Sequence, residues 1–553
     1  MSLPDDIIYD ILPHLHDDMR TLYRCLLVNR LWCRITVPIL WCRPFTISSK
    51  PFTNKHRTSR TLIIQTYVSC LNKDEITYLI PYKIDFLDIQ LTLFPYEKYL
   101  QELSDNAIDK GVKGWFQGKK LIFPFVEYDH RAEAITYALW RMFMRQCVKI
   151  QSVSIMPLYV RSGISNVPNF SDAMTALSHV RSFTCRIDWS DSAEKYQKTI
   201  QLLQRLKSVC KKITHMKVYI HEKADPGVLD AIVQIIKIQK GIKEVSFKNN
   251  MILKGNLYQF RPLLVPVMES QANYVTSLAF RSVKFNDVSI AALAGFYSLE
   301  SLCLQKCRNM TKEHSVILSA ASFRIKFLSL LRNSWSNSIT AALIAKAGVT
   351  LQQMVLDNVC TETTQAALNH CPNLNILYIE VSVYNYSLIT WIGSTKIQQL
   401  EVSFGGIFRL STEDTAKSLQ LLGEHLPATV NYLKLDGLYI SNEAFNDFIN
   451  SCKAPLSTLI ISIDCYHDFE ESVLTVLEFA YKHKTLKKYG NYDNNRGRFL
   501  IKYVENIYLN ARRNSINRHR SHHWIFRTSS KRLFIGYKHV ARSYVTSIYF
   551  TGA

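Results

Sequence analysis

The sequence predicts an α/β protein, in which a short N-terminal helical domain precedes a curved solenoid of alternating strands and helices with a parallel sheet. Three observations support this fold class. An apolar-x-x-apolar-x-apolar motif recurs along most of the 553 residues, amphipathic helical stretches separate its copies, and the first 45 residues show helical spacing instead. We expect a helical domain, a linker with irregular first repeats, a solenoid, and a basic cap or tail, at residues 1–45, 46–149, 150–492 and 493–553.

The composition is that of a folded protein, with 47% hydrophobic and 20% charged residues. No apolar run is long enough for a transmembrane helix, and the acidic N-terminus MSLPDDIIYD does not resemble a secretory signal. The 13 cysteines are scattered, odd in number and without a CxxC pair, which favours free thiols in a reducing compartment. We therefore expect the protein in the cytoplasm or nucleus.

The N-terminal stretch SLPDDIIYDILPHL predicts a helix with Ser2 as its N-cap and Pro4 in its first turn. Pro13 is expected to kink or end this helix. A second helix is predicted to carry the apolar residues from Leu22 to Trp32. A unit of about 40 residues seldom has a sufficient core of its own, so this one should pack on a partner or on the first repeat.

The motifs LPDDI (3–7), IL (11–12) and LVNRLW (27–32), with leucines between them, resemble the F-box. The variant VNRLWC…PILW is similar to one common in fungal F-box proteins. The resemblance covers the first 45 residues, and it implies docking on the Skp-type adaptor of cullin-RING ubiquitin ligases. The residues that it implies for docking are Leu3, Pro4, Ile7, Ile11, Leu15, Leu22, Leu27, Val28 and Trp32.

The stretch CLLVNRLWCRITVPILWC (25–42) concentrates three cysteines and two tryptophans in this domain. Its spacing and the expected compartment argue against a metal or disulfide site. We interpret it as an apolar surface that grips an adaptor. Trp41 is expected to pack where the helical domain meets the repeats.

The repeated motif recurs with a mean spacing of 28 residues over twelve intervals. Each copy predicts a short strand, and stretches such as 286–296 and 361–371 predict helices between the strands. One strand and one helix per period is the leucine-rich-repeat pattern. An earlier copy is suggested at Ile84. The thirteen copies begin at Ile150, Val180, Ile213, Ile242, Val275, Leu299, Ile325, Leu351, Leu374, Ile397, Val430, Leu456 and Leu486.

Three copies place Asn or Cys at the ninth position, at Asn250, Cys307 and Asn333. There the chain leaves the strand, and a small polar side chain can satisfy backbone groups inside the turn. The segment NHCPNLNILYI (369–379) also resembles the cysteine-containing repeat subtype found behind F-boxes.

The apolar ladder is expected to be core, so binding should fall to the strand positions between its residues, on the concave face. These positions are basic in the earlier strands and acidic in the later ones, at Asp357, Glu380, Glu401 and Asp436. Such a gradient could orient a charged partner, and the basic end is compatible with a phosphorylated one. The expected target-binding residues are Arg186, Lys217, Tyr219, Lys248, Arg281, Phe327, Tyr378 and Tyr432.

The chain contains no GxSxG, Walker or HExxH motif, so it is expected to be non-catalytic and to use no cofactor or metal. The Cys303 and Cys307 pair fits a strand and its turn. The histidines of the basic tail, His519, His522 and His523, have no acidic or cysteine companions and fit a solvated loop better than a zinc site.

Residues 493–553 carry 12 Lys and Arg against 2 acidic residues. The apolar pairs at 499/500, 503/504 and 507/508 predict a helix that caps the solenoid, although a basic, aromatic segment can also bind nucleic acid or a membrane surface. The resulting hypothesis is a substrate-recognition subunit of an SCF-type ubiquitin ligase. The alternative is a non-ligase scaffold or nucleic-acid-binding protein that uses the tail.

Overall fold

The computed structural model describes the chain in two compact units, Met1–Ser298 and Leu299–Ala553. The described residues are 5–16, 18–45, 54–84, 92–118, 125–156, 172–187, 193–221, 224–249, 261–322, 324–357, 359–381, 386–404, 411–438, 440–463, 476, 479–480, 485–493 and 498–503.

The first unit opens with three short helices, which side-chain caps and a proline delimit. Pro13 ends the first helix as expected, because the chain continues from Leu12 as a 3-10 turn with the proline at its second position. The second predicted helix is wrong as a single element, since Asn29 adopts an extended backbone and accepts a hydrogen bond from the Trp32 N–H at 2.9 Å. The elements are α1 (Asp5–Ile11), η1 (Leu12–Leu15), α2 (Met19–Cys25) and α3 (Arg30–Trp41).

These helices enclose a small apolar core. Ile8, Leu12, Cys25 and Ile35 are buried together, and further apolar side chains pack against them from the sides. Cys25, from the cysteine-rich stretch, is therefore a core residue of the helical domain. The partly buried residues around this core are Leu15, Leu31, Trp32 and Ile39.

The helical domain is joined directly to the first strand of the sheet. The Cys42 carbonyl, at the end of α3, accepts hydrogen bonds from the N–H groups of Gln101 and Glu102 at 2.9 and 3.2 Å. Trp41 packs on Tyr67 and Tyr96, with ring centroids 5.3 and 4.3 Å apart, so its ring contacts are with the segment between the helical domain and the repeats, where it was expected to meet the repeats themselves. The elements that follow are α4 (Asn54–Val68), α5 (Lys73–Leu79), η3 (Ile80–Tyr82), η4 (Tyr96–Tyr99), β1 (Glu102–Ser104), α6 (Asp105–Gly118) and α7 (Phe125–Gln146).

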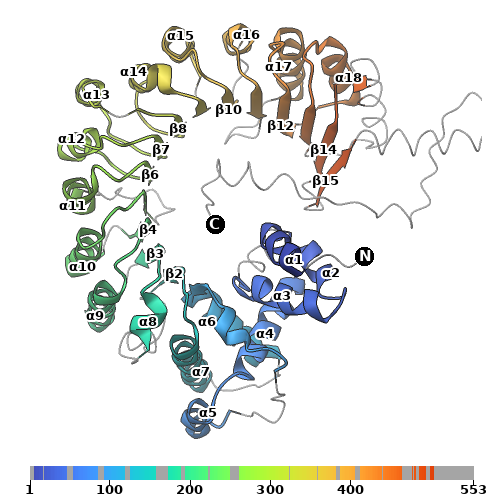
Figure 1. Ribbon diagram of the computed structural model, residues 1–553. Helices are drawn as coiled ribbons and strands as arrows, with labels where there is room; N and C mark the ends of the chain where they lie inside the picture. Colours follow the sequence, from blue (N-terminus) through green and yellow to red (C-terminus); the bar gives the residue numbers. More distant parts are fainter. Residues whose placement is uncertain are drawn as a thin grey trace, which may run out of the picture. The chain divides into compact units, whose positions relative to one another are not determined.

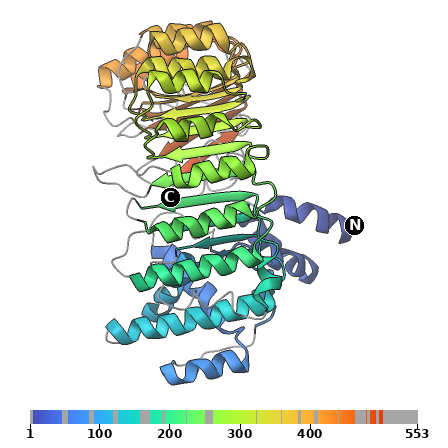
Figure 2. The ribbon, with the colours of Figure 1, turned by 90° about the vertical axis from the view of Figure 1, so that its left-hand side faces the viewer.

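The parallel sheet of the first unit begins with β1, before the first clear repeat at Ile150, because β1 pairs in parallel with β2. The suggested earlier copy at Ile84 runs into residues outside the described ones. Strands and helices then alternate, with the helices side by side (Figure 2). They are β2 (Ser152–Ile155), α8 (Ala173–Leu177), β3 (Ser182–Ile187), α9 (Ala193–Val209), β4 (His215–Ile220), α10 (Pro226–Lys237), β5 (Glu244–Asn249), α11 (Arg261–Gln271), β6 (Ser277–Arg281) and α12 (Asp287–Ala294).

The second unit continues the alternation, and its strands β7 to β14 run parallel wherever neighbours pair in register. Its elements are β7 (Ser301–Gln305), α13 (Lys312–Ser319), β8 (Phe327–Leu331), α14 (Asn337–Ala347), η6 (Gly348–Thr350), β9 (Gln353–Leu356), α15 (Thr361–His370), β10 (Ile376–Glu380), α16 (Tyr386–Ser394), β11 (Gln399–Ser403), α17 (Thr412–His425), β12 (Tyr432–Leu438), α18 (Asn442–Ser451), β13 (Thr458–Ile463), β14 (Lys488–Asp493) and β15 (Arg498–Tyr503).

Each of the thirteen motif copies forms a strand, from β2 to β14, which confirms the repeat prediction. In both units the helices cover one face of the strands (Figure 1). The apolar motif residues, such as Phe183 and Cys185 of β3, are buried on that side. The alternate residues lie on the other side, which we call the open face.

The ninth-position prediction is confirmed at Asn333. Its side-chain oxygen accepts a hydrogen bond from the Cys307 N–H at 2.8 Å, and its amide donates to the Leu304 carbonyl at 2.9 Å. The side chain of one repeat thus satisfies backbone groups at the strand end of the preceding repeat. Asn250 lies outside the described residues.

The helix predicted from residue 499 is wrong where the structure describes it, because Arg498–Tyr503 forms β15 and pairs antiparallel with β14. An edge strand presents unpaired backbone groups, and a hairpin partner satisfies them on one side. The apolar pairs have the spacing of a helical stripe, but pairing with β14 decides the local structure here. Residues 504–553, including the three tail histidines, lie outside the described residues.

Asp105 connects the start of α6 to the end of β2. Its side chain is buried, and its carboxylate accepts hydrogen bonds from the N–H groups of Asn106 and Met156. Burial raises the pKa of this carboxyl to about 7 because the ionised form loses its hydration, while the two hydrogen bonds act in the opposite direction.

We expect the Asp105→Asn protein to gain stability relative to the native protein as the pH rises from about 5 to about 8. Because the pKa of Asp105 is higher in the folded state, its carboxyl favours folding most at a pH below its pKa in the unfolded chain. This contribution to stability is lost as the pH rises through about 7. The change scales as about 1.4 kcal/mol for each unit that separates the folded and unfolded pKa values. Urea unfolding across this pH range measures it.

The matched control is Asp230→Asn, which removes the same charge from an exposed position of α10. An equal pH trend in both variants would contradict the role assigned to burial of Asp105.

Candidate protein-interaction surfaces

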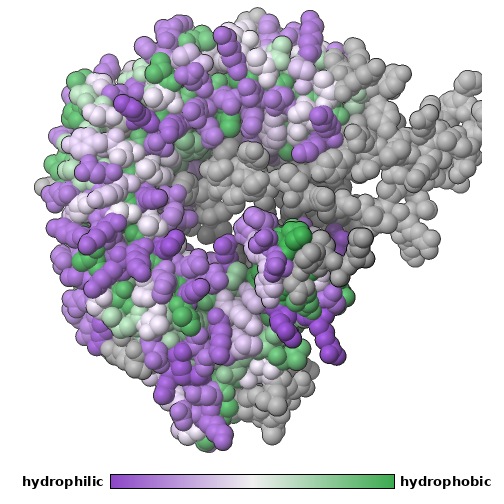
Figure 3. Space-filling view, viewed as in Figure 1, coloured by the Kyte–Doolittle hydropathy of each residue, from purple (hydrophilic) through white to green (hydrophobic). Residues whose placement is uncertain are grey.

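The N-terminal helices expose two apolar pairs, although they have a core of their own. Ile7 and Ile11 of α1 are 41% and 46% exposed, and Leu27 and Val28, in the turn after α2, are 86% and 57% exposed. Hydrophobic side chains are visible at the surface over these helices (Figure 3). Exposed apolar groups clustered in one small domain are typical of a protein interface.

The remaining residues implied for docking have different positions. Leu22 is 0% exposed, so its implied place on the docking surface is wrong. It lies on the buried side of α2, together with Cys25. Leu15 and Trp32 are half-buried against the helical core. Leu3 and Pro4 lie outside the described residues.

Two exposed aromatic residues of the same helices were missed by the sequence analysis, Tyr9 of α1 and Tyr23 of α2. Both fall outside the buried stripe of their helices, although each directly follows a buried residue, Ile8 or Leu22. Helical spacing predicts that both are exposed but gives no sign of a contact with a partner. In the sequence Tyr9 lies between Ile7 and Ile11, and Tyr23 lies four residues before Leu27.

On the open face of β3 to β6, four predicted residues stand at equivalent strand positions. Arg186, Tyr219, Lys248 and Arg281 pair one with the next in register, and Lys217 stands two residues before Tyr219 on the same face. We call these five residues the basic row. Arg186 is exposed and the other four are half-buried.

The tyrosine of the basic row is surrounded by cations. The Lys248 ammonium lies 5.2 Å from the centre of the Tyr219 ring. Burial raises the pKa of the Tyr219 phenol, while the positive charges of Arg186 and Arg281 lower it. The sequence placed these residues on one face, and the strand register aligns them across it.

In the second unit, the predicted acidic positions are partly neutralised by cations that the sequence analysis missed. Arg332, which follows β8 with a φ of 54°, forms an ion pair with Glu380 at 2.7 Å. Lys434 forms another with Glu401 at 3.2 Å. The alternation of residues in β12 already places Lys434 on the open face, so the sequence could have predicted it. Arg332 lies just after β8, and only the folded structure brings it to Glu380.

Asp357 stands on the same part of the open face and accepts a hydrogen bond from the Arg332 N–H. Burial raises the pKa of Asp357 to about 6, and the neighbouring Glu380 charge adds to this effect. Tyr378 is 8% exposed, so its expected exposure is wrong. Phe327 and Tyr432 are half-buried, and burial together with Glu401 raises the pKa of Tyr432.

The described cysteines are free thiols, and burial raises the pKa of several of them, that of Cys210 to about 12. Among the residues that the structure describes, no three His, Cys, Asp or Glu side chains are grouped to hold a metal ion. Cys303 and Cys307 occupy β7 and its turn. No helix in the described part of the chain is long and apolar enough to cross a membrane.

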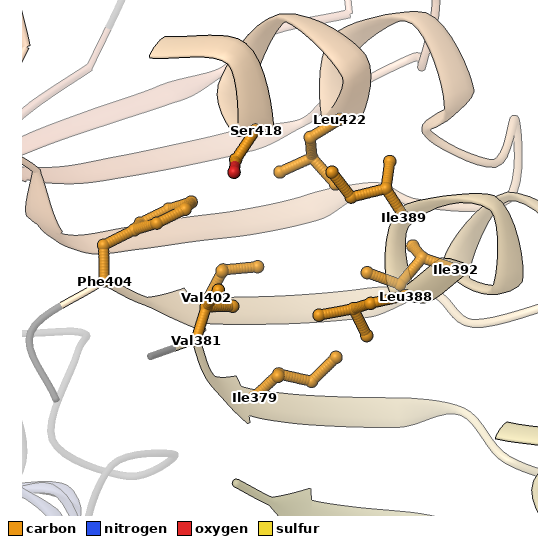
Figure 4. Close-up of a pocket in the computed structure, with 9 residues that line it drawn as sticks. All are labelled: Ile379, Val381, Leu388, Ile389, Ile392, Val402, Phe404, Ser418 and Leu422. Atoms are coloured by element: carbon orange, nitrogen blue, oxygen red, sulfur yellow. The ribbon is translucent and has the colours of Figure 1, made fainter. Parts of the chain in front are cut away.

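A small apolar cavity lies between β10, β11, α16 and α17 (Figure 4). Its volume of about 20 Å³ suffices for about one water molecule and is too small for a ligand. Ser418 is its one polar side chain, and its hydroxyl has no hydrogen-bond partner among the described residues. The cavity is lined by Ile379, Val381, Leu388, Ile389, Ile392, Val402, Phe404, Ser418 and Leu422.

These surfaces and repeats define a class of protein: a leucine-rich-repeat solenoid with an F-box-like domain at its N-terminus, suited to protein interaction. Residues 1–47 match the family model described as F-box-like. The chain therefore carries an F-box-like domain, and the helices α1 to α3 are its structure.

Comparison with curated proteins finds no match for this chain. Similar solved structures include a complex of TLR13 with ssRNA13, at 14% identity and a TM-score of 0.32, covering 59% of this chain and 41% of that one. Another is the internalin inlF from Listeria monocytogenes, at 13% identity and a TM-score of 0.28, covering 60% of this chain and 85% of that one. The chain thus spans less than half of the TLR13 chain, and likenesses this weak carry no information on partners.

We expect Ser418→Ala to raise the free energy of unfolding by about 1 kcal/mol, because it removes a buried hydroxyl that has no hydrogen-bond partner among the described residues. Ser289→Ala is the matched control, since that equally buried helical serine exchanges two hydrogen bonds with the Asn286 backbone. Its loss should cost about 1 kcal/mol. Chemical unfolding compares the two, and an equal loss in both would contradict the assignment at Ser418.

Proposed function

We propose that the protein is the substrate-recognition subunit of an SCF-type ubiquitin ligase. Its F-box-like domain would dock the Skp-type adaptor, and the open face of the repeats would hold a target protein. The observation that carries this proposal is the pair of exposed apolar groups on the F-box-like domain, at Ile7 and Ile11 and at Leu27 and Val28.

The energetics favour a docking role for these residues over a packing role. Ile8, Leu12, Cys25 and Ile35 already fill the interior of the domain, so the exposed pairs are not needed for folding. Leu27 keeps 86% of its surface exposed. Burying such a side chain against a partner contributes about 1.5–3 kcal/mol, and a few anchors of this kind dominate a typical interface.

The attachment of the domain supports the second part of the proposal. The carbonyl of Cys42 holds the N–H groups that open β1, and the aromatic contacts of Trp41 brace the same junction. A partner docked on the helices would therefore be held at a defined position relative to the strands of the first unit. In this role the chain would form no covalent bond itself. It would contribute by holding target and ubiquitin carrier in one assembly, which raises their effective concentration. We place this role in the cytoplasm or nucleus.

We expect Leu27→Glu with Val28→Glu to weaken binding of the Skp-type adaptor by about 30-fold or more, because two apolar anchors become charged. Co-purification and calorimetry with the full chain measure the loss. The control is Val316→Glu with Val349→Glu, at exposed apolar positions of the second unit, which should leave adaptor binding unchanged.

Leu22→Ala separates packing from contact in the same domain. Because Leu22 is fully buried, its truncation should lower the free energy of unfolding by about 2–5 kcal/mol, whereas the Leu27 and Val28 variant should unfold as the native protein does. Adaptor binding that is absent in the native protein, or unchanged by the double variant, would refute the proposal and favour a non-ligase scaffold.

A further inference from the structure

Five turns of the first unit, each between the end of a helix and the start of the next strand, lie side by side at the N-terminal ends of the strands. Backbone hydrogen bonds join them directly: the Arg181 carbonyl accepts from the Thr214 N–H at 2.8 Å, and the Thr214 carbonyl accepts from the Lys243 N–H at 2.8 Å. We call these turns, which precede β2 to β6, the rim. They are residues 147–151, 178–181, 210–214, 238–243 and 272–276.

The rim is strongly basic, with six exposed cations and no Asp or Glu. None of the six forms an ion pair with a residue that the structure describes, so their charge is open to solvent. The four turns that carry them span about 15 Å, since neighbouring strands are about 4.8 Å apart. The six cations are Lys149, Arg181, Lys211, Lys212, Lys240 and Lys243.

The stability of the helices does not account for this charge. Lys207 and Lys237, in the last turns of α9 and α10, offset the negative ends of the helix dipoles. The rim cations lie beyond these helix ends, where like charges close together repel one another. A polyanion bound along the rim would relieve this repulsion, and the release of its counterions would favour association.

An exposed aromatic ring lies at one end of the rim. Tyr274, in the turn before β6, is 54% exposed. Its ring packs on the turn of the preceding repeat, where a Cβ added at Gly241 would lie 3.7 Å from it, and the φ of 109° at Gly241 favours glycine. The ring is therefore held next to the turn that carries Lys240, with part of its surface open. A nucleic-acid base can stack on a ring of this kind.

A groove opens beside the middle of the rim, between α9 and α10. Its volume of about 470 Å³ is that of a small-ligand site. Lys211 of the rim lines it, together with the amide side chains of Gln204 and Gln234. Amides can hydrogen-bond the edges of unpaired bases, whereas the bases of a duplex already pair with one another. The groove therefore favours a single strand over a duplex.

These features also distinguish a nucleic acid from other polyanions. A membrane surface would attract the lysines, but within the rim, all of which the structure describes, the exposed large apolar side chains are Val148 and Tyr274, at opposite ends. So little apolar area would anchor a membrane weakly. An acidic peptide would match the charge and leave the Tyr274 ring and the groove unused.

We propose that the rim is a binding site for single-stranded nucleic acid. Its lysines contact the phosphates without reading sequence, because an ammonium is a point charge with no fixed hydrogen-bond geometry. Tyr274 stacks on a base, and the amides of the groove contact a base edge. The rim lies outside the F-box-like domain, so this inference goes beyond the proposed function and does not depend on it.

The test measures the fluorescence anisotropy of a labelled oligouridine of about 15 nucleotides with the full chain, over a range of salt concentrations. Lys211→Gln with Lys240→Gln and Lys243→Gln should weaken binding by about tenfold or more. The same variant should reduce the slope of log affinity against log salt by about 2, because each phosphate contact of a single strand contributes about 0.7 to that slope.

The matched control removes the same charge from exposed positions of the first unit outside the rim, with Lys73→Gln, Lys98→Gln and Lys110→Gln. It should leave the salt slope unchanged. Equal losses in the two triple variants would overturn the inference, because general charge would then explain the binding. Unchanged binding in the rim variant would also overturn it and would assign the binding to the basic residues of 493–553.

Tyr274→Ala tests the stacking contact separately. It should weaken oligouridine binding by about fivefold or more and leave the salt slope unchanged, whereas Tyr274→Phe should bind as the native protein does. Native affinity in Tyr274→Ala would overturn the assignment of a single strand. Thermal unfolding is measured for every variant, and a lowered midpoint in the rim lysine variant would assign these lysines a structural role and overturn the inference.

Other polyanions decide the remaining question. Tighter binding of a duplex, of polyglutamate or of vesicles of phosphatidylcholine and phosphatidylserine, lost in the rim lysine variant, would overturn the inference in favour of that partner. Adaptor binding is measured in parallel and should be unaffected by the rim variants. Failure of the nucleic-acid site and failure of adaptor docking are therefore separate results.

Discussion

The rest of each unit depends on one recurring pair of hydrogen bonds. In each pair, a backbone carbonyl of one repeat accepts from two N–H groups of the next repeat. In the first unit the Arg181 carbonyl accepts from Thr214 and His215, at 2.8 and 2.9 Å, and the Thr214 carbonyl accepts in turn from the repeat that follows. Each strand therefore begins at a register that its predecessor sets. The series starts at Cys42, in the F-box-like domain, so the same type of hydrogen bond that links the repeats also attaches this domain to the first strand.

This shared register determines the chemistry of the open face. A parallel ladder places equivalent residues of successive repeats side by side, and one strand position thus becomes a row across several strands. In the first unit such a row collects cations around Tyr219. In the second unit one such row pairs Glu401 with Lys434 on neighbouring strands, and Arg332, just after β8, reaches Glu380, so these charges neutralise one another.

The two ends of the proposed activity rely on different physical effects. Docking through Leu27 and Val28 would use apolar area that the folded domain leaves exposed, a non-directional contribution that grows with the area buried. Contacts made by the open face would use the charged and aromatic side chains of the strands, whose interactions depend on geometry.

The sequence by itself determined the helical character of the F-box-like domain, the positions of all thirteen repeat strands and the alternation that separates buried from open-face residues. These follow from local periodicity, because a strand that buries every second residue must show it in its spacing. Tertiary structure alone decided which face residues meet. It buried Leu22 and Tyr378, joined Arg332 to Glu380, and turned residues 498–503 into a strand instead of a helix. Such outcomes depend on register, neighbouring repeats and free sheet edges, which link residues far apart in the chain and leave no mark in local spacing.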